Sequence, residues 1–141
     1  MKTIIDTATA AGNFTGFLGA LKAASFLDTL RTPGPYTVFM PTDQAFGRMT
    51  PSARASMLLN VRRLKTTVTY HVVAGTIAAS NLKAGELRTV EGTSLLVTRE
   101  RGAIHVNGAL IVLADIAVSN GVIHAVDDIL WPKSAKLTSV A

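Results

Sequence analysis

The side chains that could carry out chemistry in this sequence are few: three histidines, nine carboxylates and no cysteine. Without cysteine, thiol catalysis and thiolate-bound metals are excluded. His71, His105 and His124 do not stand at the short spacing, such as i and i+4, that places two metal ligands on one helix face. Asp127 and Asp128 could add carboxylates, but such an acidic pair is more typical of a solvated turn. We therefore expect no metal and no cofactor.

The sequence also lacks the motifs of common catalytic mechanisms. No Gly-x-Ser-x-Gly stretch is present to hold a serine nucleophile on a sharp turn for His71 or His124. The carboxylates form no recognisable acid–base pair. The glycines at 16 and 19 are not followed by the lysine and hydroxyl residue of a phosphate-binding loop. These observations indicate a protein that acts by binding and is not an enzyme.

The charge balance is basic, with 14 Lys and Arg against nine Asp and Glu and a net charge of +5. A positive surface attracts acidic polysaccharides, anionic headgroups or nucleic acid, although it also simply aids solubility. The basic residues form one modest cluster, Arg62, Arg63 and Lys65. Its nearest aromatic neighbour in sequence is Tyr70, whereas single-strand binding needs stacking platforms, so we expect no nucleic-acid partner. We interpret the cluster as the solvated side of a helix whose apolar side is Val61, Leu64 and Val68.

The length and composition favour one folded domain, predicted over residues 1–132, with a polar tail over 133–141. Hydrophobic residues make up 48% of the chain and charged residues 16%, which is typical of a globule, and we expect a monomer. No apolar run reaches the roughly 20 residues of a membrane span, so no membrane insertion is expected. Asp6 interrupts the first apolar stretch, so residues 1–6 are no secretory signal. Either the protein stays inside the cell or a leader is missing from this sequence.

Apolar residues recur at helical spacing in the first half of the chain. This spacing predicts helices over 4–11 and 14–27, and further helices beginning after Thr42 and Thr50, with a break near Asn60. The two threonine hydroxyls can cap these helices by accepting a backbone N–H. The glycines at 16 and 19 weaken the second helix, and we expect them to allow close packing against another element.

The second half of the chain changes to short, strand-like segments separated by Arg101-Gly102, Asn107-Gly108 and Asn120-Gly121. Asn-Gly between apolar segments is a strong hairpin signal, because both residues tolerate a positive φ. Their spacing predicts an antiparallel sheet. Its strands are expected at 94–100, 103–106, 109–112 and 122–126, and a separate short buried strand is expected earlier, at 36–40. Helices followed by strands within one domain indicate an α+β fold.

Several motifs resemble those of the fasciclin domain family. Residues 37–46, Thr-Val-Phe-Met-Pro-Thr-Asp-Gln-Ala-Phe, are similar to its first motif, and Tyr70-His71-Val72-Val73 to its central Tyr-His motif. The stretch 106–124, with both Asn-Gly pairs, is similar to its second motif. The resemblance covers about residues 4–132. It implies a compact β-sandwich or wedge of short strands packed with several α-helices.

The resemblance also implies a function, since most family members are secreted or surface proteins that mediate adhesion. It points to a single-domain bacterial or archaeal member that binds a cell-surface receptor, a matrix protein or a polysaccharide. Asp115-Ile116 stands where the family carries an Asp-Ile adhesion motif, and Tyr70-His71 matches a second motif tied to adhesion. The alternative is a structural role for these residues. Asp115 would begin a turn with Ile116 in the core, and His71 would form a hydrogen bond with a buried carbonyl.

A second function is also open, because some fasciclin-like proteins carry a small apolar ligand such as a carotenoid or a lipid. Such a ligand needs a largely apolar pocket. A crevice between the helices and the sheet could supply it, lined by Phe14, Phe17, Leu21 and Phe39.

Overall fold

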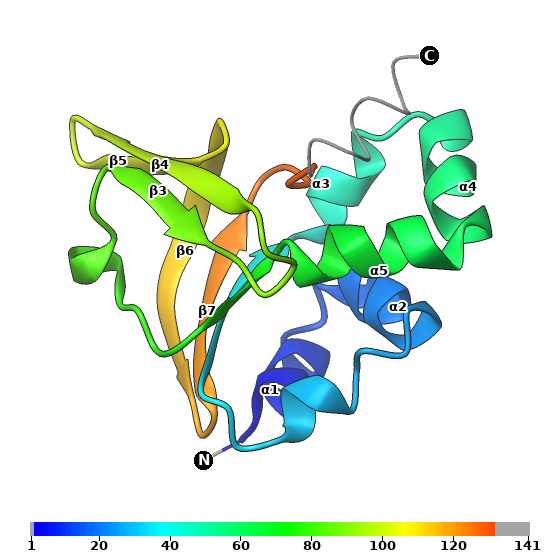
Figure 1. The fold of residues 1–141 in the computed structure, drawn as a ribbon, viewed down its shortest axis with the longest axis horizontal. Coiled ribbons are helices and arrows are strands. Elements are labelled where there is room, and N and C mark those ends of the chain that lie inside the picture. The colour runs from blue at the N-terminus through cyan, green and yellow to red at the C-terminus, as the bar shows by residue number, and fades with distance from the viewer. Residues whose placement is uncertain (1, 132–141) are drawn as a thin grey trace.

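A seven-stranded sheet in the order β2-β1-β7-β6-β5-β4-β3 runs through the molecule, and the helices gather on one side of it (Figure 1). This computed structural model describes residues 2–131, apart from the side chains at 54, 57 and 58. The tail predicted over 133–141 lies outside the described residues. The arrangement is the α+β wedge that the sequence and the resemblance predict.

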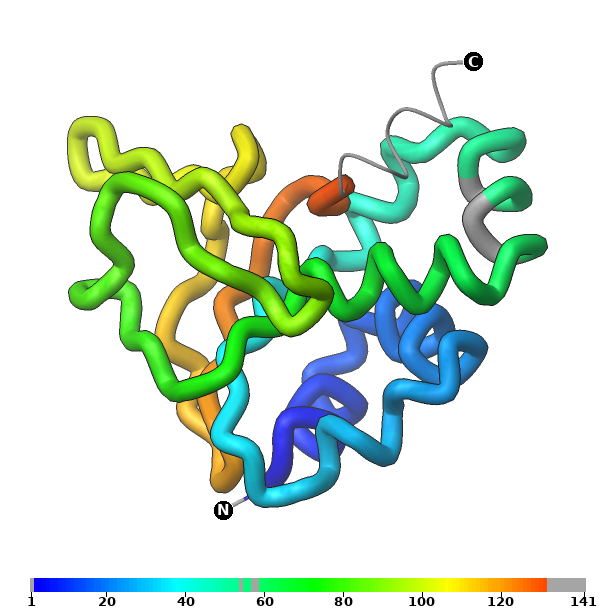
Figure 2. The backbone as a smooth tube through the Cα atoms, in the orientation of Figure 1, coloured from blue at the N-terminus to red at the C-terminus, as the bar shows by residue number. Residues whose placement is uncertain are grey.

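The helices occupy the first half of the chain and most strands the second, as the tube in Figure 2 shows. The helices are α1 (Ile4–Ala11), α2 (Thr15–Ala23), α3 (Asp43–Gly47), α4 (Pro51–Leu59) and α5 (Val61–Thr69), with short 3₁₀ turns η1 (Thr29–Arg31) and η2 (Ala79–Asn81). The strands are β1 (Tyr36–Pro41), β2 (Val72–Ala74), β3 (Gly85–Arg88), β4 (Ser94–Glu100), β5 (Ala103–Val106), β6 (Ala109–Val118) and β7 (Gly121–Val126).

The helix starts follow local side-chain chemistry. Thr42, Thr50 and Asn60 each cap the following helix by accepting the N–H of the residue three positions on, which confirms the two predicted caps and the break. The second helix is shorter than predicted: α2 ends at Ala23, and the chain turns away at Ser25 with a φ of +58°. A positive φ cannot continue a right-handed helix.

The interior strands β1 and β7 pair in parallel, from Tyr36 opposite Gly121 to Pro41 opposite Val126. The other neighbouring strands pair antiparallel. The antiparallel pairing predicted for the strands of the second half is therefore confirmed, whereas the parallel partner of the strand at 36–40 was not predicted. Parallel strands need a long connection, and here nearly all of the chain between them provides it. Local spacing in the sequence does not reveal such a distant partner.

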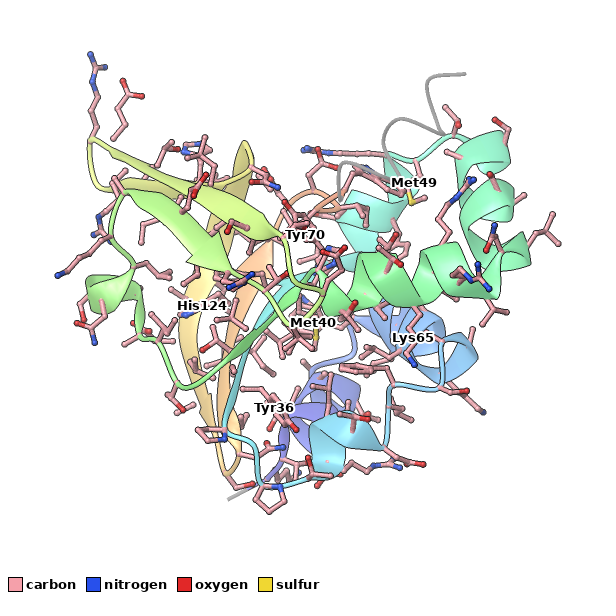
Figure 3. The ribbon with its side chains drawn as sticks, viewed as in Figure 1. Tyr36, Met40, Met49, Lys65, Tyr70 and His124 are labelled. Atoms are coloured by element: carbon pink, nitrogen blue, oxygen red, sulfur yellow. The ribbon has the colours of Figure 1, made fainter. Side chains whose placement is uncertain are left out.

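Two hydrophobic cores lie on opposite faces of β1 and β7. Met40 and Ile123 pack with the apolar sides of α1, α2 and α5, whereas Phe39 and Val126 pack with β4 and β5. Consecutive strand residues face opposite sides of a sheet, so both strands are buried on both faces. The labelled Met40 lies between the helices and the sheet in Figure 3.

Helix α2 approaches α3 closely at Gly16. A Cβ on Gly16 would lie 2.8 Å from the ring of Phe46, so the prediction of close packing is confirmed there, whereas Gly19 has no atom within 4 Å of its Cβ position. The carboxylate of Asp43, at the start of α3, accepts the N–H of Gly16 at 2.7 Å and the hydroxyl of Thr15 at 2.7 Å. A side chain at 16 would push these two helix starts apart.

The basic cluster lies on α5, and its surroundings match the interpretation in part. Arg62 and Lys65 are exposed, while Leu64 and Val68 are buried. Val61 does not lie on the buried side: it is 60% exposed. It is the first residue of α5, directly after the Asn60 cap, where the helix has not yet reached the core.

Candidate functional site

Asp115 lies in β6 where the pairing with β7 is irregular, between Leu113–Ala125 and Ile116–Ile123. Its φ is +59°, a conformation that aspartate adopts more readily than most residues. The side chain is exposed, and its Oδ1 accepts the N–H of Ala79 at 2.8 Å. Within residues 2–131, Oδ2 has no hydrogen-bond partner. The protein thus holds this carboxylate in place and leaves one oxygen for a partner.

His124, on β7, stabilises this irregular part of β6, which we call the β6 bulge. Its Nδ1 accepts the N–H of Asp115 at 3.1 Å, so Nε2 carries the proton and donates to the carbonyl of Ile77 at 2.8 Å. The ring is fully buried and stacks on Phe39, with centroids 5.6 Å apart. This histidine therefore joins β6, β7 and the loop after β2. From the sequence, His124 was the end of the second motif and a candidate metal or triad residue, and this bridging role was not predicted.

The strand also exposes apolar side chains beside Asp115. Val112 is 50% exposed and Leu113 56% exposed. Ile116 is half-buried and packs against the core that the helices share with the sheet. This stretch of β6 therefore carries one exposed carboxylate and two exposed apolar side chains, and we refer to Val112, Leu113 and Asp115 together as the β6 surface.

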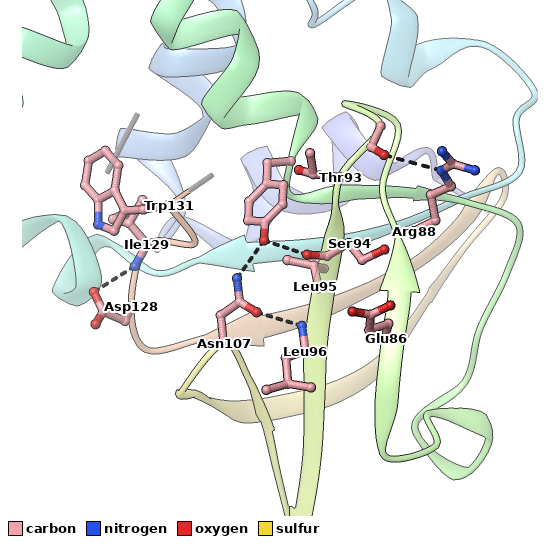
Figure 4. Close-up of a pocket in the computed structure, with 12 residues that line it drawn as sticks. Glu86, Arg88, Thr93, Ser94, Leu95, Leu96, Asn107, Asp128, Ile129 and Trp131 are labelled. Carbon is pink, nitrogen blue, oxygen red and sulfur yellow. Dashed lines mark hydrogen bonds between the residues drawn. The ribbon is translucent and has the colours of Figure 1, made fainter. Parts of the chain in front are cut away.

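Tyr70, at the end of α5, is only 4% exposed and uses its hydroxyl inside the protein. The hydroxyl donates to the carbonyl of Ser94 at 2.8 Å and accepts from Nδ2 of Asn107 at 2.9 Å. Oδ1 of Asn107 in turn accepts the N–H of Leu96 at 2.7 Å. These bonds, drawn in Figure 4, tie the helical side to β4 and to the turn between β5 and β6.

His71 is fully buried next to Tyr70. Its Nδ1 donates to the carbonyl of Thr67 at 2.7 Å, and its Nε2 accepts the N–H of Leu130 at 3.0 Å. Burial lowers the pKa of His71 to about 4, against the opposing effect of the bond to Thr67. The imidazole is therefore neutral at physiological pH and joins α5 to the segment after β7. A fully buried ring offers no surface to a partner.

Asn120 has a structural role that its place in a predicted turn did not reveal. The pairing of Val118 with Gly121 places the hairpin loop at Ser119-Asn120, one residue earlier than predicted. The buried amide of Asn120 accepts the N–H of Ile4 and donates to two carbonyls in the segment before β1. The other predicted Asn-Gly turn is confirmed: Asn107 and Gly108 have φ values of +50° and +84°.

A pocket of about 820 Å³ opens beside Tyr70, between the β3–β4 hairpin and the segment after β7 (Figure 4). Charged side chains from both walls face it, together with the chain's single tryptophan. Its polar and aromatic lining includes Tyr70, Glu86, Arg88, Asn107, Asp128 and Trp131. These residues come from several segments of the sequence, so no single motif predicts the pocket. The isolated tryptophan was the one feature of the sequence that could have drawn attention to it.

The four side chains expected to line an apolar crevice between helices and sheet do not line one in the part of the chain that the structure describes. Phe14, Phe17, Leu21 and Phe39 are each at most 2% exposed and fill the protein interior. Phe39 also belongs to the core on the other face of the sheet from the three helical residues. The prediction is wrong because apolar helical spacing marks a packed core as readily as it marks a ligand pocket.

Two general findings concern the described residues 2–131. Their histidines and carboxylates form no group of three that could hold a metal ion. None of their helices is both long and apolar enough to cross a membrane.

Comparisons with known sequences extend the resemblance. The fasciclin domain profile matches residues 12–132. Protein sll1483 of Synechocystis sp. is 37% identical over 92% of this chain and 73% of its own length. The uncharacterized protein sll1735 of the same organism is 34% identical over 92% of this chain and 98% of its length. Human periostin is 31% identical over 84% of this chain, which covers 15% of periostin.

A solved structure agrees with the fold. The fasciclin domain pair of fasciclin I, an insect cell adhesion molecule, superposes with a TM-score of 0.81 at 20% identity. The match covers 95% of this chain and 52% of that one, so the chain spans about half of the pair. The likeness shows the fold, and the profile match over most of the chain shows the family. This chain therefore belongs to the fasciclin domain family, whose domains occur in cell adhesion proteins.

Proposed function

We propose that this domain is an extracellular adhesion module that binds a cell-surface or matrix component without catalysing a reaction. Its family membership supports adhesion, because the same domain builds an insect cell adhesion molecule. The observation that carries the proposal is the exposed carboxylate of Asp115, held rigidly on the β6 bulge with Oδ2 free among the described residues. Rigid placement lowers the entropy cost of binding.

The β6 surface has the composition of a small binding site. Val112 and Leu113 can bury apolar area against a partner, and Asp115 can accept hydrogen bonds or complete a metal site on a receptor. Tyr70 and His71 would support binding indirectly, because their contacts lie inside the protein. One such surface is small, so strong adhesion would come from many copies acting together.

The test is binding of the purified domain, displayed on beads, to cells of the source organism and to candidate host cells. Asp115→Asn keeps the size of the side chain and a carbonyl for the N–H of Ala79, but removes the charge. Glu100→Gln is the matched control, an exposed carboxylate at the end of β4. Circular dichroism establishes that each variant is folded.

We expect saturable binding by the parent domain and by Glu100→Gln, and weak binding by Asp115→Asn. Binding that Asp115→Asn retains in full would keep adhesion but move the contact away from the β6 surface. Failure of the parent domain to bind any of the cells at high bead density would refute the adhesion proposal.

A further inference from the structure

The pocket beside Tyr70 contains the only tryptophan of the chain. Trp131 is half-buried: it packs against the core that includes the helices and also lines the pocket (Figure 4). The face of an indole ring is a large, rigid apolar surface with little conformational entropy to lose. A partly exposed ring anchored in this way can receive a ligand with a flat apolar face.

The pocket also offers charged side chains whose polar atoms are largely free. Within residues 2–131, Glu86 has no hydrogen-bond partner for its carboxylate, and Asp128 accepts only the N–H of the adjacent Ile129, at 2.8 Å. Arg88 donates from Nε to the carbonyl of Gly92 at 3.3 Å, which leaves its two Nη groups free among the described residues. Two acceptors and one forked donor therefore face the same space.

The floor between these walls is rigid. Tyr70 and Asn107 are bonded to each other and to the backbone of β4, so neither must reorganise when a ligand arrives. Preformed sites lose less free energy to ordering when they bind. The volume of about 820 Å³ lies within the range of small-molecule pockets.

From this arrangement we infer that the pocket binds sugar units of a neutral polysaccharide. A pyranose ring has an apolar C–H face that packs on an indole, and a rim of hydroxyls that both donate and accept hydrogen bonds. The carboxylates of Glu86 and Asp128 can accept hydrogen bonds from such hydroxyls, and the guanidinium of Arg88 can donate to them. This inference rests on the proposed adhesion and adds to the contact at the β6 surface a second one, a neutral glycan held in the pocket.

The charges in the pocket decide between classes of ligand. Two carboxylates against one guanidinium give the pocket a negative balance, although the whole chain carries a net charge of +5. An acidic polysaccharide would meet repulsion at Glu86 and Asp128. A wholly apolar ligand would remove these charged groups from water without replacing their hydrogen bonds, at a high cost in free energy.

The single tryptophan makes the test direct, because all indole fluorescence of the protein comes from Trp131. The full chain is titrated with cellohexaose, laminarihexaose, maltohexaose and mannohexaose, and with hexagalacturonate as the acidic probe. The pocket variants are Glu86→Ala and Asp128→Ala. The control is Glu100→Ala, at the end of β4. Isothermal calorimetry repeats the strongest titration.

We expect a saturable change in emission with at least one neutral hexaose, and affinity about tenfold weaker in Glu86→Ala and Asp128→Ala, with Glu100→Ala unchanged. Three results would overturn the inference: no saturable change with any neutral hexaose, tighter binding of hexagalacturonate, or equal binding by the pocket variants and the parent chain. Bead adhesion that survives Glu86→Ala and Asp128→Ala would leave the proposed function standing while the inference fails. Binding of a hexaose without adhesion to cells would support the pocket as a sugar site and refute the proposed adhesion.

Discussion

Replacement of Gly121 by alanine should destabilise the protein more than the same replacement at any other glycine of the sheet. Gly121 begins β7 opposite Tyr36, in the parallel pair of interior strands, with a φ of +151°. A Cβ there would lie 1.8 Å from the carbonyl oxygen of Tyr36 and within 2.9 Å of its C and N atoms. These are backbone atoms of an interior strand, which cannot rotate aside as a side chain would.

The size of the effect follows from what must move. Ordinary van der Waals contact begins at 3.4 Å, so β1 and β7 would have to separate by about 1.6 Å at this point. That displacement breaks the hydrogen bond from the N–H of Tyr36 to the carbonyl of Asn120, now 2.9 Å. Overpacking, the unfavourable φ and the lost bond together predict a loss of about 3–5 kcal/mol, a large part of a typical total of about 5–15 kcal/mol.

The assay is urea unfolding followed by circular dichroism, with two other glycines as controls. Gly102 has a φ of +83° but no atom within 4 Å of its Cβ position, so Gly102→Ala isolates the backbone strain and should cost about 1 kcal/mol. Gly19, in α2, has neither feature, and Gly19→Ala should stabilise the protein by about 0.5–1 kcal/mol. A Gly121→Ala variant within about 0.5 kcal/mol of the parent would refute the reasoning, because no flexible group is available to absorb the clash.

Three further predictions concern buried polar side chains, each measured by urea unfolding. Between pH 6.5 and 4 the protein should lose about 3 kcal/mol of unfolding free energy through His71, because the unfolded chain binds the proton near 6.5 and the folded chain only near 4; an equally steep pH profile in His71→Gln would contradict this. Asn120→Ala should cost about 2–4 kcal/mol by leaving three backbone groups without their partner, two of them in buried hydrogen bonds, and a loss below about 1 kcal/mol would argue against its bridging role. Tyr70→Phe should cost about 1–2 kcal/mol, and a double-mutant cycle with Asn107→Ala should show coupling; additive losses would mean that their bond contributes nothing.

Features with a local cause could be predicted from the sequence. A threonine hydroxyl caps the helix that begins beside it, so Thr42 and Thr50 marked the starts of α3 and α4 correctly. Asn107-Gly108 needs only its own backbone preference to form a tight turn. The close approach at Gly16 was also foreseen, although the sequence could not name Phe46 as the neighbour.

Features that depend on distant partners could not be predicted. Strand β3 carries mostly exposed side chains and shows no apolar alternation, so only its pairing with β4 makes it a strand. The parallel partner of β1 lies some 80 residues away, and nothing in either segment specifies it. The pocket is of the same kind, since Glu86, Asp128 and Trp131 come from opposite walls and meet only after the sheet has formed.

The same distinction separates the residues that build this domain from those that can bind. Tyr70, His71 and Asn120 lie in the motifs that carry the family resemblance, and each directs its polar side-chain atoms to partners inside the protein. Such residues specify the wedge, and a fold shared with an adhesion molecule does not by itself specify a ligand. Free polar atoms instead remain at Asp115, where the pairing of β6 is irregular. They also remain in the pocket beside Tyr70, on side chains such as Glu86. The specificity of this domain should therefore change with substitutions at these exposed positions, whereas substitutions in the buried motifs should change its stability first.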